Sequence, residues 1–186
     1  LLPIINNILH KNEPESNKCL IIVPTRELAI QIDQQMQGLS YFTGLNSIAV
    51  YGGGDGDLFT QEKIALSEGA SVITATPGRL IAHLKMGYVN MESLHFLVLD
   101  EADRMLDMGF IRDIKKILEI LPKQKQTLLF SATMPKEISN LAGGLLKDPT
   151  RVEVTPESTT VDKIKQSIHT VPKTHKPLLL KTLFLI

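Results

Sequence analysis

The sequence has little of what marks several protein classes. Its single cysteine, Cys19, excludes a disulfide framework and favours a reducing, cytoplasmic location. No apolar run approaches the roughly 20 residues of a membrane-spanning helix, so we expect no membrane partner. Twenty basic residues balance twenty acidic ones, which argues against a protein that coats polyanions by bulk charge. A local phosphate-binding face remains compatible with this balance.

One pattern recurs along the 186 residues: a short apolar run, a polar corner, and a segment with helical periodicity. Apolar residues make up 43% of the chain, enough for a full core. Strands alternating with helices predict an α/β fold, in which a mostly parallel sheet carries helices on both faces. The candidate strands are residues 19–23, 47–51, 72–75, 96–99, 127–130 and 152–154.

A change of composition near residue 155 indicates a domain boundary. We predict a first domain over 1–155, a linker over 156–162 and the beginning of a second domain over 163–186. Residues 164–171 alternate like a strand, and the segment from His175 is typical of a helix. The chain starts without methionine and stops inside an apolar run, so we expect both ends to be cut.

Polar corners follow the candidate strands. In open α/β sheets, ligands bind outside the carboxyl ends of the strands. A helix that begins at such a corner also presents free N–H groups to anions. The corners read PTR (24–26), GGG (52–54), TPGR (76–79), DEAD (100–103) and SAT (131–133).

The acidic corner carries the strongest chemical signal. Asp100 and Glu101 come directly after the apolar run Phe96–Leu99, which is the Walker-B arrangement. There the first carboxylate holds Mg²⁺ beside a nucleotide, mostly through water, and the second orients or deprotonates the attacking water. Alternatively, Asp100 caps the next helix. Capping accounts for one or two acids, but not for this adjacent pair together with Asp103.

Two corners combine threonine, proline and arginine. Thr25 is a candidate N-cap, which leaves Arg26 available for a phosphate. In TPGR, threonine is again the cap, proline suits the first helical position, and Gly78 permits close approach of another backbone. Arg79 is then available for a phosphate or an internal acid. Two such corners on one sheet edge suggest a track for a phosphodiester backbone.

The remaining corners are less specific. GGGDGD does not match GxGxxG, so a flexible turn competes with close approach of a ligand. The hydroxyls of Ser131 and Thr133 suit either a bond to a carboxylate or a cap for the helix begun at Pro135. The five histidines show no metal-ligand spacing, and we interpret them as structural or surface residues.

Taken together, these corners resemble the first RecA-like domain of DEAD-box ATP-dependent RNA helicases over about residues 1–155. The resemblance implies a RecA-like three-layer sandwich with ATP and Mg²⁺ as cofactors. Asp100 and Glu101 would serve Mg²⁺ and hydrolysis, and Asp103 would pair with Ser131 and Thr133 to link the ATP site to domain closure. The domain would bind RNA through its phosphates and 2′-hydroxyls, with little sequence preference. The implied RNA-contacting residues are Pro24, Thr25, Arg26, Gly52, Gly53, Thr76, Pro77, Gly78 and Arg79.

The chain also departs from the family's pattern. It contains no Gly-Lys pair, hence no GxxxxGK(S/T) phosphate loop, and no adenine-recognition segment. We expect both before Leu1 and the rest of the second domain after Ile186. We therefore expect this chain alone to lack ATPase activity, and its sheet to have an open slot where the strand before the loop belongs. The competing hypotheses are an RNA-binding module without ATP turnover and a DNA-directed helicase or other NTPase.

Overall fold

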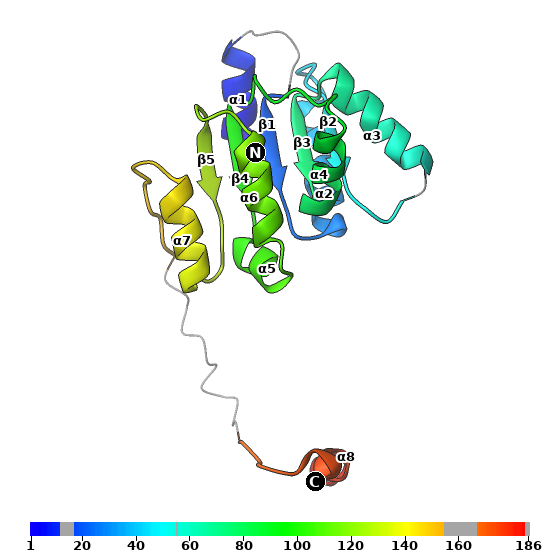
Figure 1. Ribbon diagram of the computed structural model, residues 1–186, viewed down its shortest axis with the longest axis vertical. Coiled ribbons are helices and arrows are strands. Elements are labelled where there is room, and N and C mark those ends of the chain that lie inside the picture. The colour runs from blue at the N-terminus through cyan, green and yellow to red at the C-terminus, as the bar shows by residue number, and fades with distance from the viewer. Residues whose placement is uncertain (12–16, 55, 155–166, 185–186) are drawn as a thin grey trace. The chain divides into compact units, whose positions relative to one another are not determined.

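The structure is a computed structural model that describes residues 1–11, 17–54, 56–154 and 167–184. The chain divides into two compact units, Leu1–Pro149 and Thr150–Ile186. The first unit contains the whole β-sheet (Figure 1). Within the described ranges, none of the helices combines the length and the apolar character that crossing a bilayer requires.

The sheet consists of five parallel strands in the order β2-β3-β1-β4-β5 (Figure 1). Each strand is four residues long, and β1, β3 and β4 are buried along their whole length because helices cover both faces. This confirms the predicted α/β fold. The strands are β1 (Cys19–Ile22), β2 (Ser47–Val50), β3 (Val72–Ala75), β4 (Phe96–Leu99) and β5 (Gln126–Leu129).

Two hydrophobic clusters, one on each side of the sheet, show which helices cover which face. On one side, α1 (Leu2–Lys11) and α2 (Arg26–Ser40) pack against strand residues such as Cys19 and Ile21. On the other side, five helices contribute residues to the cluster that contains Leu20 and Ile22. They are α3 (Gly56–Glu68), α4 (Pro77–Lys85), α5 (Ala102–Asp107), α6 (Ile111–Ile120) and α7 (Lys136–Leu145).

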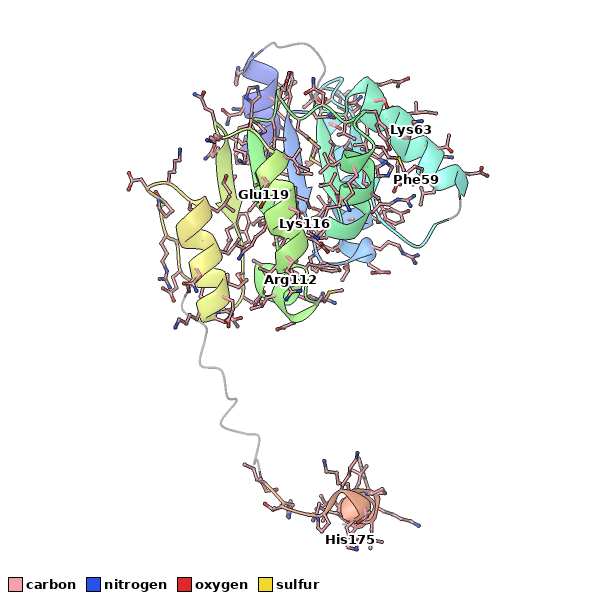
Figure 2. All side chains as sticks on the ribbon, viewed as in Figure 1. Phe59, Lys63, Arg112, Lys116, Glu119 and His175 are labelled. Atoms are coloured by element: carbon pink, nitrogen blue, oxygen red, sulfur yellow. The ribbon has the colours of Figure 1, made fainter. Side chains whose placement is uncertain are left out.

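Helix α6 illustrates how the sequence selects a buried face. Ile114 and Ile117 are fully buried, whereas the residues between them are charged and exposed. Arg112, Lys116 and Glu119 lie along this helix (Figure 2). The three-to-four-residue spacing of its apolar side chains therefore fixes the orientation of α6 on the sheet.

The register of the strands brings their carboxyl ends to one level. Ile22 of β1 pairs with both Ala75 of β3 and Leu99 of β4. The outer strands follow the same register, since Val50 pairs with Ala75 and Leu129 with Leu99. All five polar corners consequently begin at the same edge of the sheet.

One expectation about the sheet is wrong. Residues 152–154 form no strand: Val152 and Val154 are 84% and 87% exposed, because no neighbouring strand pairs with them in the described chain. The five described strands are contiguous and β5 is an edge strand, so no slot separates them. The open slot expected for the strand before the phosphate loop stays a prediction.

The second unit contains a 3₁₀ turn, η1 (Lys173–His175), that leads into α8 (Lys176–Leu183). The helix predicted from His175 is thus confirmed. Residues 167–171 are irregular, so the strand predicted over 164–171 is wrong for its described part, while 164–166 lie outside the described residues. The predicted linker, 156–162, lies outside them as well.

Candidate functional site

The strand order divides the polar edge of the sheet into two halves. Following β2-β3-β1-β4-β5, the corners appear as 52–54, 76–79, 24–26, 100–103 and 131–133. The glycine corner and the two Thr/Pro/Arg corners are therefore neighbours on one half. The acidic corner and the hydroxyl corner are neighbours on the other half.

Asp100 is held in place at the end of β4. Its backbone N–H donates to the Ile22 carbonyl at 3.0 Å, and its Oδ1 accepts the N–H of Glu101 at 2.9 Å. Burial raises the pKa of the Asp100 carboxyl, and the negative charge of Glu101 adds to this, against the opposing effect of the hydrogen bond. The alternative in which Asp100 caps α5 is wrong, because the N-cap residue is Glu101 and the Asp100 carboxylate bonds to the N–H of Glu101 rather than to a helical N–H.

Glu101 adopts an unusual backbone conformation. Its φ angle is +50°, in the left-handed region that residues other than glycine seldom occupy. Its carboxylate accepts a hydrogen bond from Nη1 of Arg104 at 3.1 Å, one turn along α5. Such backbone strain is typical of functional corners. The ion pair means that the Glu101 carboxylate has a partner in this structure.

Asp103 connects the acidic corner to the hydroxyl corner. Its Oδ2 accepts both the N–H and the hydroxyl of Thr133, at 2.9 and 2.8 Å, and its own N–H donates to Oγ of Ser131 at 3.1 Å. Desolvation tends to raise the pKa of Asp103, but these hydrogen bonds outweigh it and lower the pKa below its ordinary value. The structure thus brings Asp103, Ser131 and Thr133 together. No side chain caps α7, so the alternative in which these hydroxyls cap that helix is wrong.

An open pocket of about 470 Å³ lies over these corners. Its lining includes Asp100, Glu101 and Asp103 together with Arg104 and Ser131. Among the described residues, no cluster of three or more His, Cys, Asp or Glu side chains forms a ready metal cage. Two adjacent carboxylates beside an open pocket fit Mg²⁺, which keeps several waters and takes few protein ligands beside a nucleotide's phosphates.

The PTR corner exposes its arginine. Thr25 caps α2 as predicted, since its Oγ1 accepts the N–H of Leu28 at 3.3 Å, while Pro24 is buried. The side chain of Arg26 is 51% exposed, and it forms an ion pair with the exposed Glu27 at 3.5 Å. Arg26 also lies beside the glycine corner, because its Nη1 is 3.6 Å from where a Cβ at Gly53 would be. Gly53 itself has φ +90°, a conformation that favours glycine.

The TPGR corner differs in part from expectation. Pro77 begins α4 as predicted, and it is buried. Thr76 occupies the N-cap position, but its side chain makes no capping hydrogen bond, so that prediction is wrong. Gly78 is exposed, and a Cβ built there would meet no atom within 4 Å, which leaves space for an approaching ligand. The Arg79 side chain turns inward, where its Nε donates to Glu62 at 2.6 Å.

Glu62 lies near this edge and was not predicted from the sequence as a site residue. It is fully buried in α3, where its carboxylate meets Arg79 and His83. One signal was present in the sequence: Glu62 precedes the buried Leu66 by four residues, so it lies on the apolar face of its helix. His83 is buried and hydrogen-bonded, as its structural interpretation predicts.

Comparisons with known proteins agree with this geometry. The family model of the DEAD/DEAH box helicases matches residues 1–141. ATP-dependent RNA helicase DDX47 of Drosophila melanogaster is 39% identical over 180 residues, which are 96% of this chain and 34% of that protein. ATP-dependent RNA helicase DeaD of Escherichia coli is 41% identical over 171 residues, or 91% of this chain and 26% of DeaD. The chain thus spans about a third or less of the length of these two relatives. With a family model matched over most of its length, this chain belongs to the DEAD/DEAH box helicase family.

Proposed function

We propose that the chain supplies the polar edge on which an RNA helicase couples ATP binding and hydrolysis to RNA binding and local duplex unwinding. The observation that carries this proposal is the common level of the five corners, set by the strand register. It makes the acidic pocket and the three remaining corners parts of one surface. Relatives named ATP-dependent RNA helicases support the same assignment.

In this proposal the acidic half serves the nucleotide. Asp100 and Glu101 hold Mg²⁺, largely through water. When bound, the ion neutralises the charge of the phosphate oxygens. Asp100 is pre-positioned by its bonds to Ile22 and Glu101. Glu101 orients the attacking water, for which its carboxylate must release Arg104.

The bond set between Asp103 and Thr133 gives the nucleotide pocket a link to the next corner. The Asp103 carboxylate borders the pocket, while Thr133 follows the edge strand β5. A shift of the acidic corner would therefore displace residues 131–133 as well. We propose that this link transmits nucleotide binding to domain closure.

The other half serves RNA. Neighbouring strands are about 4.8 Å apart, so three adjacent corners span about 10 Å, the axial rise of roughly three nucleotides at about 3.4 Å each. Arg26, Gly52, Gly53 and Gly78 are exposed there. Arg26 offers a guanidinium, and the three glycines leave room for the RNA backbone to come close to the protein backbone. This surface suits phosphate and 2′-hydroxyl groups rather than base edges. Pro24 and Pro77 are buried, and we propose that they shape the corners from within.

ATP turnover requires more than these residues. The sequence contains no Gly-Lys pair, and a phosphate loop supplies most contacts to the β- and γ-phosphates. We therefore propose that the 186-residue chain binds Mg-ATP weakly on its own. If the full-length gene product were also inactive with ATP, the alternative of an RNA-binding module without turnover would hold.

Calorimetry of Mg-ATP binding and RNA-stimulated hydrolysis by the full-length gene product test the proposal. Asp100→Asn and Glu101→Gln keep the side-chain volumes, and each is expected to abolish hydrolysis. Asp113→Asn is the matched control, because Asp113 lies on α6 and pairs with Lys116, away from the acidic pocket. Retained turnover in Asp100→Asn would refute the assignment of the acidic half. Equal stimulation by DNA and RNA would favour the DNA-directed alternative.

A further inference from the structure

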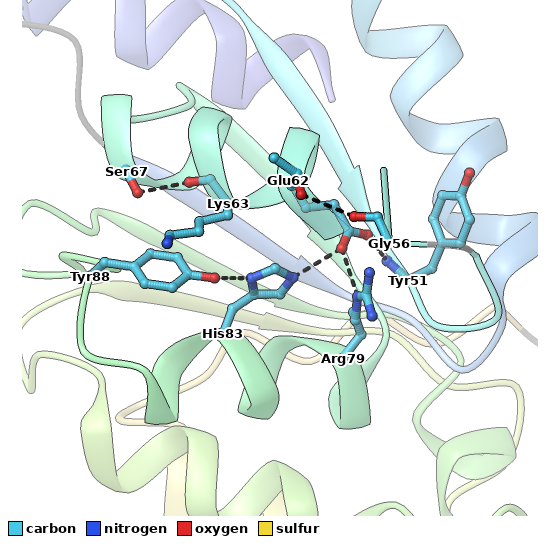
Figure 3. Close-up of polar contacts among 9 residues, drawn as sticks. Tyr51, Gly56, Glu62, Lys63, Ser67, Arg79, His83 and Tyr88 are labelled. Atoms are coloured by element: carbon cyan, nitrogen blue, oxygen red, sulfur yellow. Dashed lines mark hydrogen bonds and ion pairs between the residues drawn. The ribbon is translucent and has the colours of Figure 1, made fainter. Parts of the chain in front are cut away.

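We propose that Glu62 and Arg79 are positioning residues for RNA binding, which fix two RNA-facing corners without touching RNA. This inference rests on the proposed function and concerns its RNA-binding half. Glu62 comes from α3 and Arg79 from the first turn of α4 (Figure 3). Of the two arginines predicted to contact RNA, the inference leaves Arg26 as the phosphate ligand.

A single carboxylate connects the two corners. Oε1 of Glu62 accepts the N–H of Tyr51 at 2.9 Å, and Tyr51 directly precedes the glycine corner. Oε2 accepts from Nε of Arg79 at 2.6 Å, directly after Gly78. The carboxylate thus bonds to the backbone at the start of one corner and to a side chain at the end of the other. Its displacement would change the spacing between them.

Arg79 is turned away from any ligand at the edge. Its side chain is 16% exposed, against 51% for Arg26. Its guanidinium carbon lies 4.4 Å from the centre of the Phe59 ring, and its Nη2 is buried without a hydrogen-bond partner. A guanidinium covered in this way suits an internal ion pair more than a nucleic acid backbone, for which an exposed fork is needed.

His83 bonds to the same carboxylate oxygen of Glu62 as Arg79 does. Nε2 of His83 lies 2.9 Å from Oε2 of Glu62, and since a carboxylate only accepts, Nε2 is the donor. Nδ1 of His83 hydrogen-bonds to the hydroxyl of Tyr88. Phe59 stacks on the imidazole at 4.4 Å between ring centres, and Figure 3 shows the polar chain from Tyr88 to Arg79. With these partners the carboxylate has little freedom to rotate.

Charge explains why a neutral side chain would not replace Glu62 fully. A buried guanidinium without its anion is strongly unfavourable, so Arg79 would move toward solvent and α4 would lose its tie to the glycine corner. Glutamine keeps one oxygen that can accept from Tyr51 or Arg79, but not the charge. Leucine keeps neither. Glu62→Leu should therefore weaken RNA binding more than Glu62→Gln.

The test measures RNA affinity as a function of salt, using the full-length gene product with Mg²⁺, a non-hydrolysable ATP analogue and a fluorescent single-stranded oligouridine. We expect Glu62→Leu to weaken binding roughly tenfold, and Glu62→Gln to weaken it less. The two Glu62 variants and Arg79→Leu should leave the slope of log K for RNA binding against log salt concentration unchanged, because no phosphate contact is lost. Arg26→Ala should weaken binding and reduce the slope by about 0.7, the value for one phosphate contact on a single strand.

The controls separate this inference from a general loss of structure. Glu68→Gln removes the same charge from an exposed position of α3 and should leave RNA binding unchanged. Mg-ATP affinity without RNA should stay at the unmodified value in every Glu62 variant. If Glu62→Leu does not fold, Glu62→Gln carries the test.

Three results would overturn the inference alone: unchanged RNA affinity in the folded Glu62 variants, tighter RNA binding by these variants, or a salt slope that falls in Arg79→Leu as it does in Arg26→Ala. If the unmodified protein does not bind RNA, the proposed function fails together with the inference.

Discussion

Replacing Thr133 by valine tests the bond set that joins the acidic corner to the hydroxyl corner. The change keeps the side-chain shape and the backbone N–H bond to Asp103, but removes the hydroxyl that donates to Oδ2 at 2.8 Å. A hydrogen bond to a charged group is worth about 1.5–3 kcal/mol when it is shielded from water. Thr133 is exposed, so solvent screening reduces the expected loss of unfolding free energy to about 1 kcal/mol.

The loss should depend on pH in a defined direction. The pKa of Asp103 is lowered in the folded state, so its ionised form contributes stability above the ordinary value of 3.8, and this contribution disappears as pH falls through the folded pKa. Removing one donor raises the folded pKa toward the ordinary value. Thr133→Val should therefore be destabilised near neutral pH and progressively less so in acid.

Urea unfolding of the chain between neutral pH and about pH 3 measures both effects. Thr133→Ser keeps a hydroxyl and is the matched control, with a stability close to that of the unmodified chain. A loss that is the same at every pH would refute the electrostatic reasoning and attribute the change to packing. Equal losses of unfolding free energy in Thr133→Ser and Thr133→Val would also refute the electrostatic reasoning.

Three further predictions concern residues away from the polar edge. Burial raises the pKa of the Cys19 thiol to about 12, so a thiol reagent at pH 8 should modify Cys19 no faster than the chain unfolds; rapid labelling of the native chain would contradict this. Burial also raises the pKa of Asp33 in the folded state, so the protonated carboxyl contributes stability at low pH, and this contribution is lost as pH rises through the folded pKa. In urea unfolding, Asp33→Asn should therefore be more stable than the unmodified chain near neutral pH and should lose this advantage in acid. Leu97→Ala, in the fully buried β4, should lower the unfolding free energy by about 2–5 kcal/mol, and a loss below about 1 kcal/mol in the same titration would show that the core relaxes around the cavity.

The sequence was most informative where burial and local geometry act together. Phe96–Leu99 is apolar throughout because both faces of β4 are covered, and its strand was predicted with the observed bounds. Thr25 capped its helix as its position predicted. Residues 152–154 show the limit of such patterns, since a β-branched run forms a strand only where a neighbouring strand supplies hydrogen bonds.

Features that depend on long-range placement were not available from the sequence. The alternation of strands and helices predicts a parallel sheet, but the order β2-β3-β1-β4-β5 does not follow from it. That order makes the glycine corner and the two Thr/Pro/Arg corners neighbours. The inward turn of Arg79 likewise depends on Glu62, which is 17 residues away on another helix. The roles of the predicted site residues remain predictions for the experiments above.

The central position of β1 has a consequence for how such a domain can diversify. Its last residues bond to both neighbours: the Ile22 carbonyl accepts the N–H of Asp100, and the N–H of Val23 donates to the Ala75 carbonyl, each at 3.0 Å. The offset between the acidic half and the other half is therefore set by main-chain atoms, which every residue type except proline provides. Descendants of one ancestral gene can exchange side chains at any corner, and so acquire new substrates or partners, while inheriting the same spacing between the two halves.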